Sequence, residues 1–152
     1  MKLIRLLNIQ LQKYEEIQIP RGEIWKVSGD EINADYVGVG SVVERYPLLF
    51  SGGMKLRGMS SGRITGLAFS KNGTELKINK VQDLTVYLKK DETFTIPKGK
   101  FFKGLIYGMD FVSGNNLLAY AADGFVLKTQ EKNSSGIISG ILCEIKREVE
   151  NV

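Results

Sequence analysis

The chain has 152 residues, of which 43% are hydrophobic and 25% charged, so it has the composition and length of one ordinary globular domain. Its 21 basic and 17 acidic residues are interleaved and give a net charge of +4, without the concentrated basic stripe that is typical of nucleic-acid binding. With no histidine and a single cysteine, the chain has no disulfide of its own, and the usual transition-metal sites are excluded.

The N-terminal segment predicts neither secretion nor membrane insertion. Residues 1–7 are apolar and basic, but Asn8, Gln10 and Gln12 interrupt the run and no small-residue cleavage site follows. No apolar stretch approaches the ~18 residues that a membrane-spanning helix needs. We therefore expect a protein that is made in a cytoplasm and has no membrane partner.

The first part of the chain is predicted to form short β-strands. Residues 7–12 alternate apolar and polar side chains, which is the period of a half-buried strand, and residues 17–19 resume it. Residues 20–22, Pro-Arg-Gly, predict a turn before a strand over residues 24–27, because proline presets φ and glycine accepts a positive φ. The glycine-spaced, β-branched residues 37–43 indicate a further strand with bulges.

The rest of the chain shows the same spacing of strands and turns. Asn72-Gly73 and Asp123-Gly124 each predict a hairpin, because these dipeptides favour tight reversals between strands. Short strands at such intervals are typical of an antiparallel all-β sandwich, and we expect a jelly-roll-like one. The predicted strands are residues 63–69, 74–78, 84–88, 117–122, 125–128 and 137–145.

Three sequence blocks occur twice in the same order, which favours internal duplication. Their common order predicts one compact domain over residues 1–152, built from two pseudo-equivalent halves at about residues 15–82 and 92–145. Trp25 and Phe102 occupy matching positions and are predicted to be core anchors. Residues 104–111 have no counterpart in this alignment. The paired blocks are residues 19–26 with 96–103, 27–29 with 112–114, and 60–67 with 134–141.

No catalytic apparatus is recognisable, and we expect neither an enzyme nor a bound metal or cofactor. Without histidine, Ser-His-Asp and Cys-His nucleophiles are excluded, and no phosphate-binding glycine loop is present. Asp30, Glu31 and Asp35 fall in a predicted turn-rich loop, where solvated carboxylates are ordinary, so hydrolysis by an acid pair is a minor alternative. Asn33 adds a possible calcium ligand, but the EF-hand pattern is missing. Cys143 is expected to be a buried apolar side chain.

Two groups of side chains are candidates for contact with partners. Tyr36, Tyr46, Tyr107 and Tyr120 lie in turn-rich or glycine-containing stretches, where tyrosine suits either a glycan or protein contact or the edge of the core; Tyr36, Tyr46 and Tyr120 are the candidates for contact. Residues 1–14 form a possible assembly strand whose apolar face could add to a neighbour's sheet. Its apolar side chains are Leu3, Leu7, Ile9 and Leu11.

Two motifs resemble those of small virion proteins from tailed phages that infect Bacteroidetes, the crAss-like group among them. The family pattern Pro-x-Gly-Lys-x-Trp-Lys-Ile is matched at Pro20, Gly22, Trp25, Lys26 and Val27. The closing pattern Gly-x-Ile-Ser-x-Ile-Glu-Phe is matched at Gly136, Ile138, Ser139, Gly140 and Ile141, but its Glu-Phe end is absent. The Pro-rich Leu-Pro-x-Gly approach in the middle of the family is also replaced, by the block at residues 96–99.

The resemblance implies a β-rich virion component: a capsid decoration, head-fibre or tail-fibre protein, often a homotrimer. It covers about a third of the chain and brings no catalytic residue with it. On this basis we expect a structural protein of the virion, made in the host cytoplasm, that binds copies of itself and other virion proteins. The alternative is a carbohydrate-binding or host-adhesion module that recognises a surface glycan.

Overall fold

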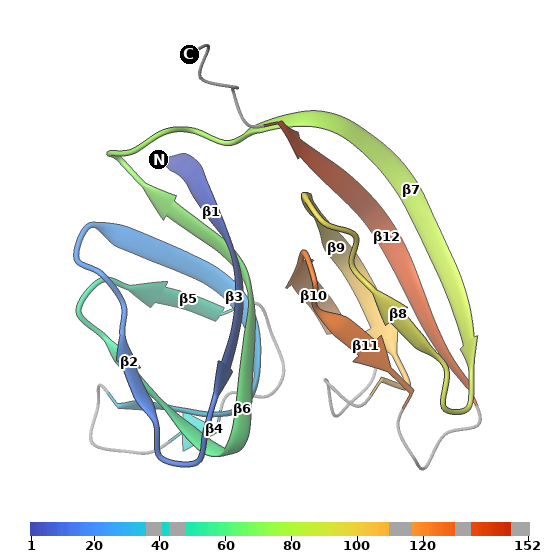
Figure 1. The fold of residues 1–152 in the computed structure, drawn as a ribbon, viewed down its shortest axis with the longest axis horizontal. Helices are drawn as coiled ribbons and strands as arrows, with labels where there is room; N and C mark the ends of the chain where they lie inside the picture. Colours follow the sequence, from blue (N-terminus) through green and yellow to red (C-terminus); the bar gives the residue numbers. More distant parts are fainter. Residues whose placement is uncertain (36–40, 43–47, 110–116, 130–134, 147–152) are drawn as a thin grey trace.

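All regular elements in the described part of the chain are β-strands (Figure 1). The computed structural model describes residues 1–35, 41–42, 48–109, 117–129 and 135–146. The strands form antiparallel sheets that pack against one another, so the predicted all-β sandwich class is confirmed. The jelly-roll detail is not confirmed, because each sheet draws its strands from one part of the chain only.

The first half of the chain forms the six-stranded sheet A. Its central strand is β6, whose C-terminal part pairs with β1, whose N-terminal part pairs with β2, and which pairs with β3 over most of its length. Strand β5 pairs with β3 and lies at the edge of the sheet. The strands are β1 (Lys2–Leu11), β2 (Glu16–Gln18), β3 (Glu23–Asp35), β4 (Ser41–Val42), β5 (Leu48–Ser51) and β6 (Lys55–Ser70).

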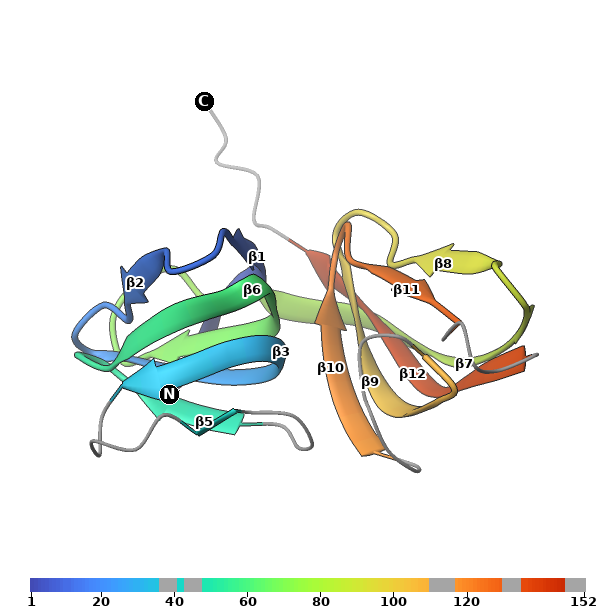
Figure 2. The ribbon, with the colours of Figure 1, turned by 90° about the horizontal axis from the view of Figure 1, so that it is seen from below.

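The second half forms the four-stranded sheet B and the two-stranded sheet C. Sheet B has the order β10-β9-β12-β7, and sheet C pairs β11 with β8. Sheet C covers one face of sheet B (Figure 2). The strands are β7 (Lys77–Lys89), β8 (Thr93–Thr95), β9 (Lys100–Tyr107), β10 (Leu117–Ala122), β11 (Val126–Lys128) and β12 (Ser135–Lys146).

Corresponding strands of the two halves pair in the same register. Trp25 of β3 lies opposite Ala68 of β6, and Phe102 of β9 lies opposite Leu142 of β12. The turn after each Ile-Pro pair is closed by the same backbone bond: Glu23 N–H donates to the Pro20 carbonyl at 3.2 Å, and Lys100 N–H donates to the Pro97 carbonyl at 3.2 Å.

The register changes one detail of the repeat read from the sequence. Val27 lies opposite Gly66, and Gly104 lies opposite Gly140 in the same way. The strand position that corresponds to Val27 is therefore Gly104, and no insertion separates the Pro-Gly turn from the rest of β9. Residues 112–114, which the sequence pattern paired with residues 27–29, lie outside the described residues.

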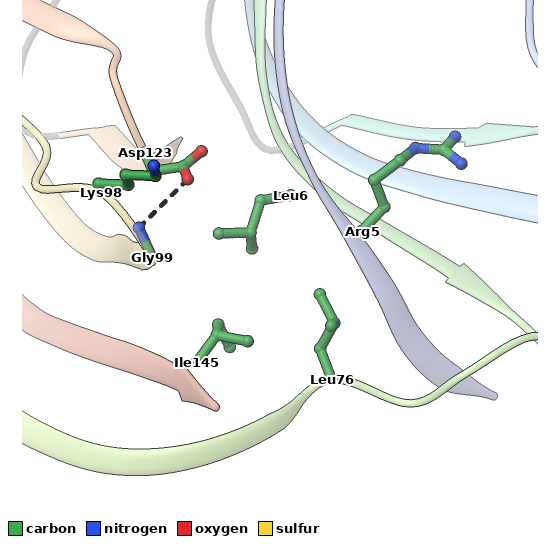
Figure 3. Close-up of a pocket in the computed structure, with 7 residues that line it drawn as sticks. All are labelled: Arg5, Leu6, Leu76, Lys98, Gly99, Asp123 and Ile145. Atoms are coloured by element: carbon green, nitrogen blue, oxygen red, sulfur yellow. Dashed lines mark hydrogen bonds between the residues drawn. The ribbon is translucent and has the colours of Figure 1, made fainter. Parts of the chain in front are cut away.

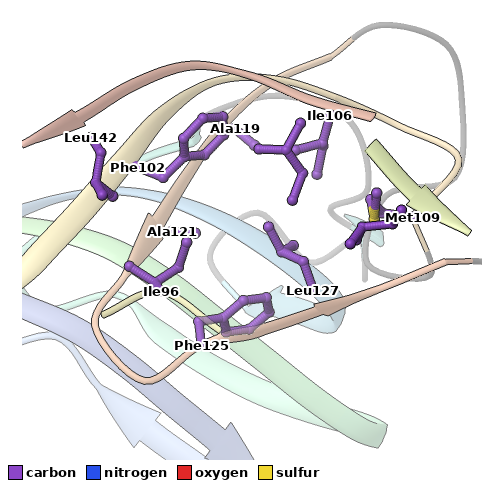
Figure 4. Packing of buried hydrophobic residues seen from close by; sticks show 11 residues of the cluster. Ile96, Phe102, Ile106, Met109, Ala119, Ala121, Phe125, Leu127 and Leu142 are labelled. Atoms are coloured by element: carbon purple, nitrogen blue, oxygen red, sulfur yellow. The ribbon is translucent and has the colours of Figure 1, made fainter. Parts of the chain in front are cut away.

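The two aromatic anchors are buried in separate clusters, as predicted. Trp25 lies in a cluster inside sheet A with Val27, Phe50 and Ile64. Phe102 lies between sheets B and C in the cluster drawn in Figure 4. A third cluster joins the halves, so that outer faces of sheets A and B are buried against each other. Its buried members are Leu3, Leu67, Leu76, Phe101, Tyr120 and Cys143.

Both predicted hairpins are wrong, although chain reversals occur where the dipeptides stand. Asn72-Gly73 lies in the connection between β6 and β7, which pair with other strands and belong to different sheets. Asp123-Gly124 forms a turn closed by a bond from Phe125 N–H to the Ala122 carbonyl, but β10 then pairs with β9 and β11 with β8. These turns carry the chain from one sheet to another.

The edge of β10 is held against the outer face of sheet A (Figure 2). Tyr120 N–H donates to Ser28 Oγ at 3.0 Å, and Ala122 N–H donates to Thr65 Oγ1 at 2.7 Å. The Asn8 side-chain amide donates to the Asp123 carbonyl at 3.2 Å. Two backbone donors of an edge strand are thereby satisfied, which removes a liability of exposed edges.

Candidate functional site

The described residues contain no group of three or more His, Cys, Asp or Glu side chains that could hold a metal ion. The acidic residues expected in a loop lie instead in β3, where a bulge separates Asp30 from Ile32. Glu144 of β12 accepts a hydrogen bond from the Asn79 amide at 3.2 Å and lies 4.0 Å from the Lys100 ammonium. These contacts are those of a surface carboxylate with structural partners.

A groove between the halves is the first candidate site (Figure 3). It has a volume of about 370 Å³ and is lined by Arg5 and Leu6 of β1, by Leu76, and by side chains from the second half. Two shallower hollows adjoin it, one sharing Lys98 and Asp123 and the other lying beyond Gly124.

The charged groups of this groove already have structural partners. Arg5 Nη2 lies 2.5 Å from Glu23 Oε1, which also accepts a hydrogen bond from the Trp25 indole at 3.3 Å. Asp123 Oδ2 accepts a hydrogen bond from Gly99 N–H at 3.2 Å and so fixes the Pro-Gly turn. The groove therefore provides an apolar floor and a single lysine, with no pair of groups placed for acid–base chemistry.

The outer face of sheet B is the second candidate and the larger one. Residues directly opposite in an antiparallel sheet project to the same side, and alternate residues along a strand share that side. Tyr87, Ile137 and Tyr107 therefore form one row across β7, β12 and β9, and Leu105 with Ser139 belongs to the next row. We call these five residues the open face.

The open face is exposed and largely apolar. Tyr87 is 77% exposed, Leu105 47% and Tyr107 46%, and Ile137 and Ser139 are half-buried. The same side of the sheet continues through Lys103 and Ile141 to Phe101 and Cys143, which are covered by sheet A. One end of this face is thus buried by the first half, and the other end has apolar side chains in contact with solvent. Clusters of exposed apolar residues mark interaction sites in soluble proteins.

Tyr120 is not part of an accessible surface. Its side chain is 3% exposed and lies in the cluster between the halves, with Lys26 5.1 Å and Lys103 5.7 Å from the ring centroid. This places a cation–π partner from each half beside one ring. The prediction of Tyr120 as a glycan or protein contact is therefore corrected to a role between the halves. Tyr36 and Tyr46 lie outside the described residues.

The predicted assembly strand uses its apolar face within its own chain. Leu7 and Leu11 are buried in the cluster of sheet A, Leu3 is buried between the halves, and Ile9 packs half-buried against the first of these clusters. Strand β1 also pairs with β6 from Lys2 to Leu11. The apolar side chains of β1 are therefore already used within the chain, but β1 is the terminal strand in the order of sheet A, so its addition to a neighbour's sheet stays a prediction.

Cys143 is a free, buried thiol, as predicted from the sequence. Burial raises the pKa of the thiol above its ordinary value, and the positive charge of Lys103 opposes that shift only in part. A thiol held protonated is a poor nucleophile. Cys143 is therefore a packing residue between the halves.

The open face could not be found from the sequence blocks alone. Tyr87, Leu105 and Tyr107 were parts of apolar strands, and their exposure depends on which strand face is covered by sheet A or sheet C. The available signal was the alternation along residues 84–88, which separates Leu84, Val86 and Leu88 from Tyr87.

No protein-family model, curated protein or solved structure matches the chain. In the part of the chain that the structure describes, no helix is long and apolar enough to cross a membrane.

Proposed function

We propose that the chain is a structural protein of a phage particle, a capsid decoration, head-fibre or tail-fibre component, that acts through protein–protein contacts. The observation that carries the proposal is the open face, an exposed apolar surface on a framework of paired strands. Such a surface favours association with another protein over catalysis, because it presents area and no aligned reactive groups. The proposal assigns no catalytic step, metal or cofactor to the chain.

The placement in a virion comes from the sequence motifs, and their positions fit a scaffold role. Pro20 and Gly22 form the turn into β3, and Trp25 is buried in the core of sheet A. Ile138 and Gly140 lie in β12 on the side that faces sheet C. The motif residues thus support the framework, and the proposed partners are copies of the chain and other virion proteins, joined in the host cytoplasm, with a homotrimer favoured.

Incorporation into particles tests this proposal. Phage carrying a tagged copy of the chain should retain the tag on purified virions, and labelling should locate it on the head or the tail. Leu105→Asp should reduce incorporation at least about tenfold, because it places a carboxylate in an apolar contact. Val126→Asp is the matched control, since Val126 is 44% exposed on sheet C, away from the open face. Virions that lack the wild-type chain altogether would refute the proposal.

A glycan-binding module is the second candidate, and the exposed tyrosines favour it. Tyr87 and Tyr107 flank Ile137 in one row, so two amphipathic rings are offered on one face. In this case, binding of the purified protein to host surface glycans should be lost in Tyr107→Ala and kept in Tyr14→Ala, a variant of a tyrosine in the first half that is 66% exposed. Absence of binding across an array of host glycans would exclude this candidate.

A further inference from the structure

We propose that the open face binds strand β5 of a second copy of this chain, in a head-to-tail contact that repeats the contact already present between the two halves. The inference extends the proposed function by naming the partner of the open face. Its basis is the contact between β10 and the outer face of sheet A. The counterpart of β10 in the first half is β5, and the counterpart of that outer face in the second half is the open face. Neither counterpart is used in such a contact within the described part of the chain.

Strand β5 holds the place in the first half that β10 holds in the second. Phe50 of β5 lies opposite Trp25, and Ala121 of β10 lies opposite Phe102. Each strand is followed by a turn whose glycine bonds the residue before the proline: Gly53 N–H donates to the Ile19 carbonyl at 2.8 Å, and Gly124 N–H donates to the Ile96 carbonyl at 2.9 Å. The two edges therefore have the same backbone setting.

Within the described part of the chain, only one of these two edges is used. Tyr120 lies opposite Lys103 and is buried on sheet A, whereas its counterpart Leu49 lies opposite Lys26 and is 71% exposed. The Ala122 amide donates to the Thr65 hydroxyl, whereas the counterpart Ser51 amide has only the Met54 sulfur at 3.3 Å, a weak acceptor. Strand β5 thus presents an exposed leucine and an amide that would gain from a better acceptor.

The open face is the matching surface that no part of the described chain covers. On sheet A, Ser28 and Thr65 receive the edge of β10; the residues at the same positions of sheet B are Leu105 and Ser139. Ser139 can supply a hydroxyl acceptor as Thr65 does, and Leu105 can supply apolar contact for Leu49. The open face is also continuous with the buried surface between the halves, through Ile141 and Lys103.

The partner that this geometry selects is a second copy and not the same chain. In both views of the molecule, strand β5 is part of the first half, whereas sheet B belongs to the second half (Figures 1 and 2). A contact between two different surfaces of identical copies is heterologous, so it produces a closed ring if its rotation closes and a filament if it does not. A trimeric ring is one such closed form.

Mixing two variants tests this contact directly. Leu105→Asp damages the open face and Leu49→Asp damages β5, so each variant alone should show an about tenfold or greater loss of self-association by light scattering and sedimentation. An equimolar mixture should recover a species of two chains, because each variant keeps the surface that the other lacks. Val126→Asp, the exposed control on sheet C, should associate as the wild type does.

Three results would overturn the inference. They are a wild-type chain that stays monomeric at high concentration, a Leu105→Asp variant that associates normally, and a mixture of the two variants that stays monomeric. The last result would mean that β5 and the open face do not bind each other, whereas a Leu49→Asp variant that associates normally would assign the open face to a contact with its own copy. A monomer that binds glycans through Tyr107 would assign the face to a sugar. In each case, incorporation of the wild-type chain into virions would still support the proposed function, so the two claims can fail separately.

Discussion

The two halves of the molecule share their strand pairing and differ on their outer faces. In each half a buried aromatic residue, Trp25 or Phe102, follows the Pro-Gly turn and pairs across to the same position of a long strand. On the outer face, the first half has Ser28 and Thr65 and uses them to hold β10, whereas the second half has Leu105 and Ser139.

This difference separates the side chains that fill the core of each half from those on its outer face. Side chains that point inward must fill the core of their own half, so both halves keep large apolar residues there. Side chains on the outer face affect only what the half meets. The first half holds β10 on its outer face, whereas the second half has an apolar outer face open to solvent.

The largest expected effect comes from removing a core aromatic residue. Phe102→Ala should lower the free energy of unfolding by about 3–5 kcal/mol, because Phe102 is fully buried between sheets B and C and its removal leaves a cavity. If the shared cluster between the halves couples them, both halves should unfold in one transition. Trp25, the only tryptophan, reports on the first half by fluorescence, while circular dichroism reports on all strands.

This experiment tests whether the two halves unfold together. The Trp25 fluorescence transition of Phe102→Ala should shift to lower urea together with the dichroism transition. A fluorescence transition that stays at the wild-type midpoint while dichroism splits into two steps would mean that the halves unfold independently. Tyr87→Ala, at an exposed position of the same half, should leave the free energy of unfolding from both signals within about 0.5 kcal/mol of wild type.

The next effect comes from the glycines at which paired strands approach closely. A Cβ added at Gly140 would lie 2.6 Å from the Gly104 Cα, and one at Gly66, whose φ is +154°, would lie 2.7 Å from the Val27 Cα. Both contacts are with backbone and cannot be relieved by a rotamer change. Gly66→Ala and Gly140→Ala should therefore each destabilise the fold by about 2 kcal/mol or more.

A turn glycine provides the control for this pair. Gly22 has a φ of +84°, but an added Cβ would have open space around it, so Gly22→Ala should cost only about 1 kcal/mol. Thermal unfolding of the three variants would measure the order. If Gly66→Ala and Gly140→Ala differed widely from each other, the close approach of strands would not be a shared property of the halves.

Removing a hydroxyl at the contact between the halves should have a smaller effect on stability, and only when the hydroxyl belongs to the first half. Thr65 Oγ1 accepts from Ala122 N–H and lies 3.0 Å from the Leu7 carbonyl, to which it donates. Thr65→Val keeps the shape and leaves two buried polar groups unpaired, which should cost about 1–3 kcal/mol. Ser139→Ala, at the corresponding position of the open face, should leave the stability of the dilute monomer nearly unchanged. Equal losses in the two variants, measured by urea unfolding, would remove the distinction between a used and an open face.

The sequence was a good guide to strands and turns and a poor guide to pairing. Alternation correctly predicted the second half of β1 and the core of β7, because it records which side of each strand is buried, and an apolar run predicted the long β12. Asn72-Gly73 and Asp123-Gly124 also mark true reversals. A turn does not choose the partner of the strand that follows it, and here both partners come from distant segments.

The candidate site was hidden from the sequence for the same reason. Tyr120 and Tyr107 both belong to apolar strands, yet one is buried and the other exposed, because sheet A covers only one end of sheet B. Likewise Leu7 and Leu11 are covered by the core of sheet A, and Leu3 is covered by the contact between the halves. The covering of a face depends on how the sheets pack on each other, which no local pattern encodes.

The smallest expected effect concerns Cys143, whose counterpart in the first half is Phe69. Both side chains contribute to the cluster between the halves, but only the thiol can ionise. Burial raises the pKa of Cys143 in the folded state, so the folded chain keeps the proton at a pH where the unfolded chain has lost it. The stability that the protonated thiol contributes is complete below the pKa of the unfolded state, and it is lost as the pH rises through the pKa of the folded state.

Urea unfolding from neutral to alkaline pH should therefore show wild type losing stability relative to Cys143→Ala, which has no proton to release. The difference between the two proteins isolates the thiol from the lysines and tyrosines that titrate in the same range. A thiol reagent should also label the native protein far more slowly than the unfolded one. If the two unfolding curves stayed parallel across the alkaline range and labelling were rapid, Cys143 would lie in contact with water, and the halves would not be sealed against each other at this position.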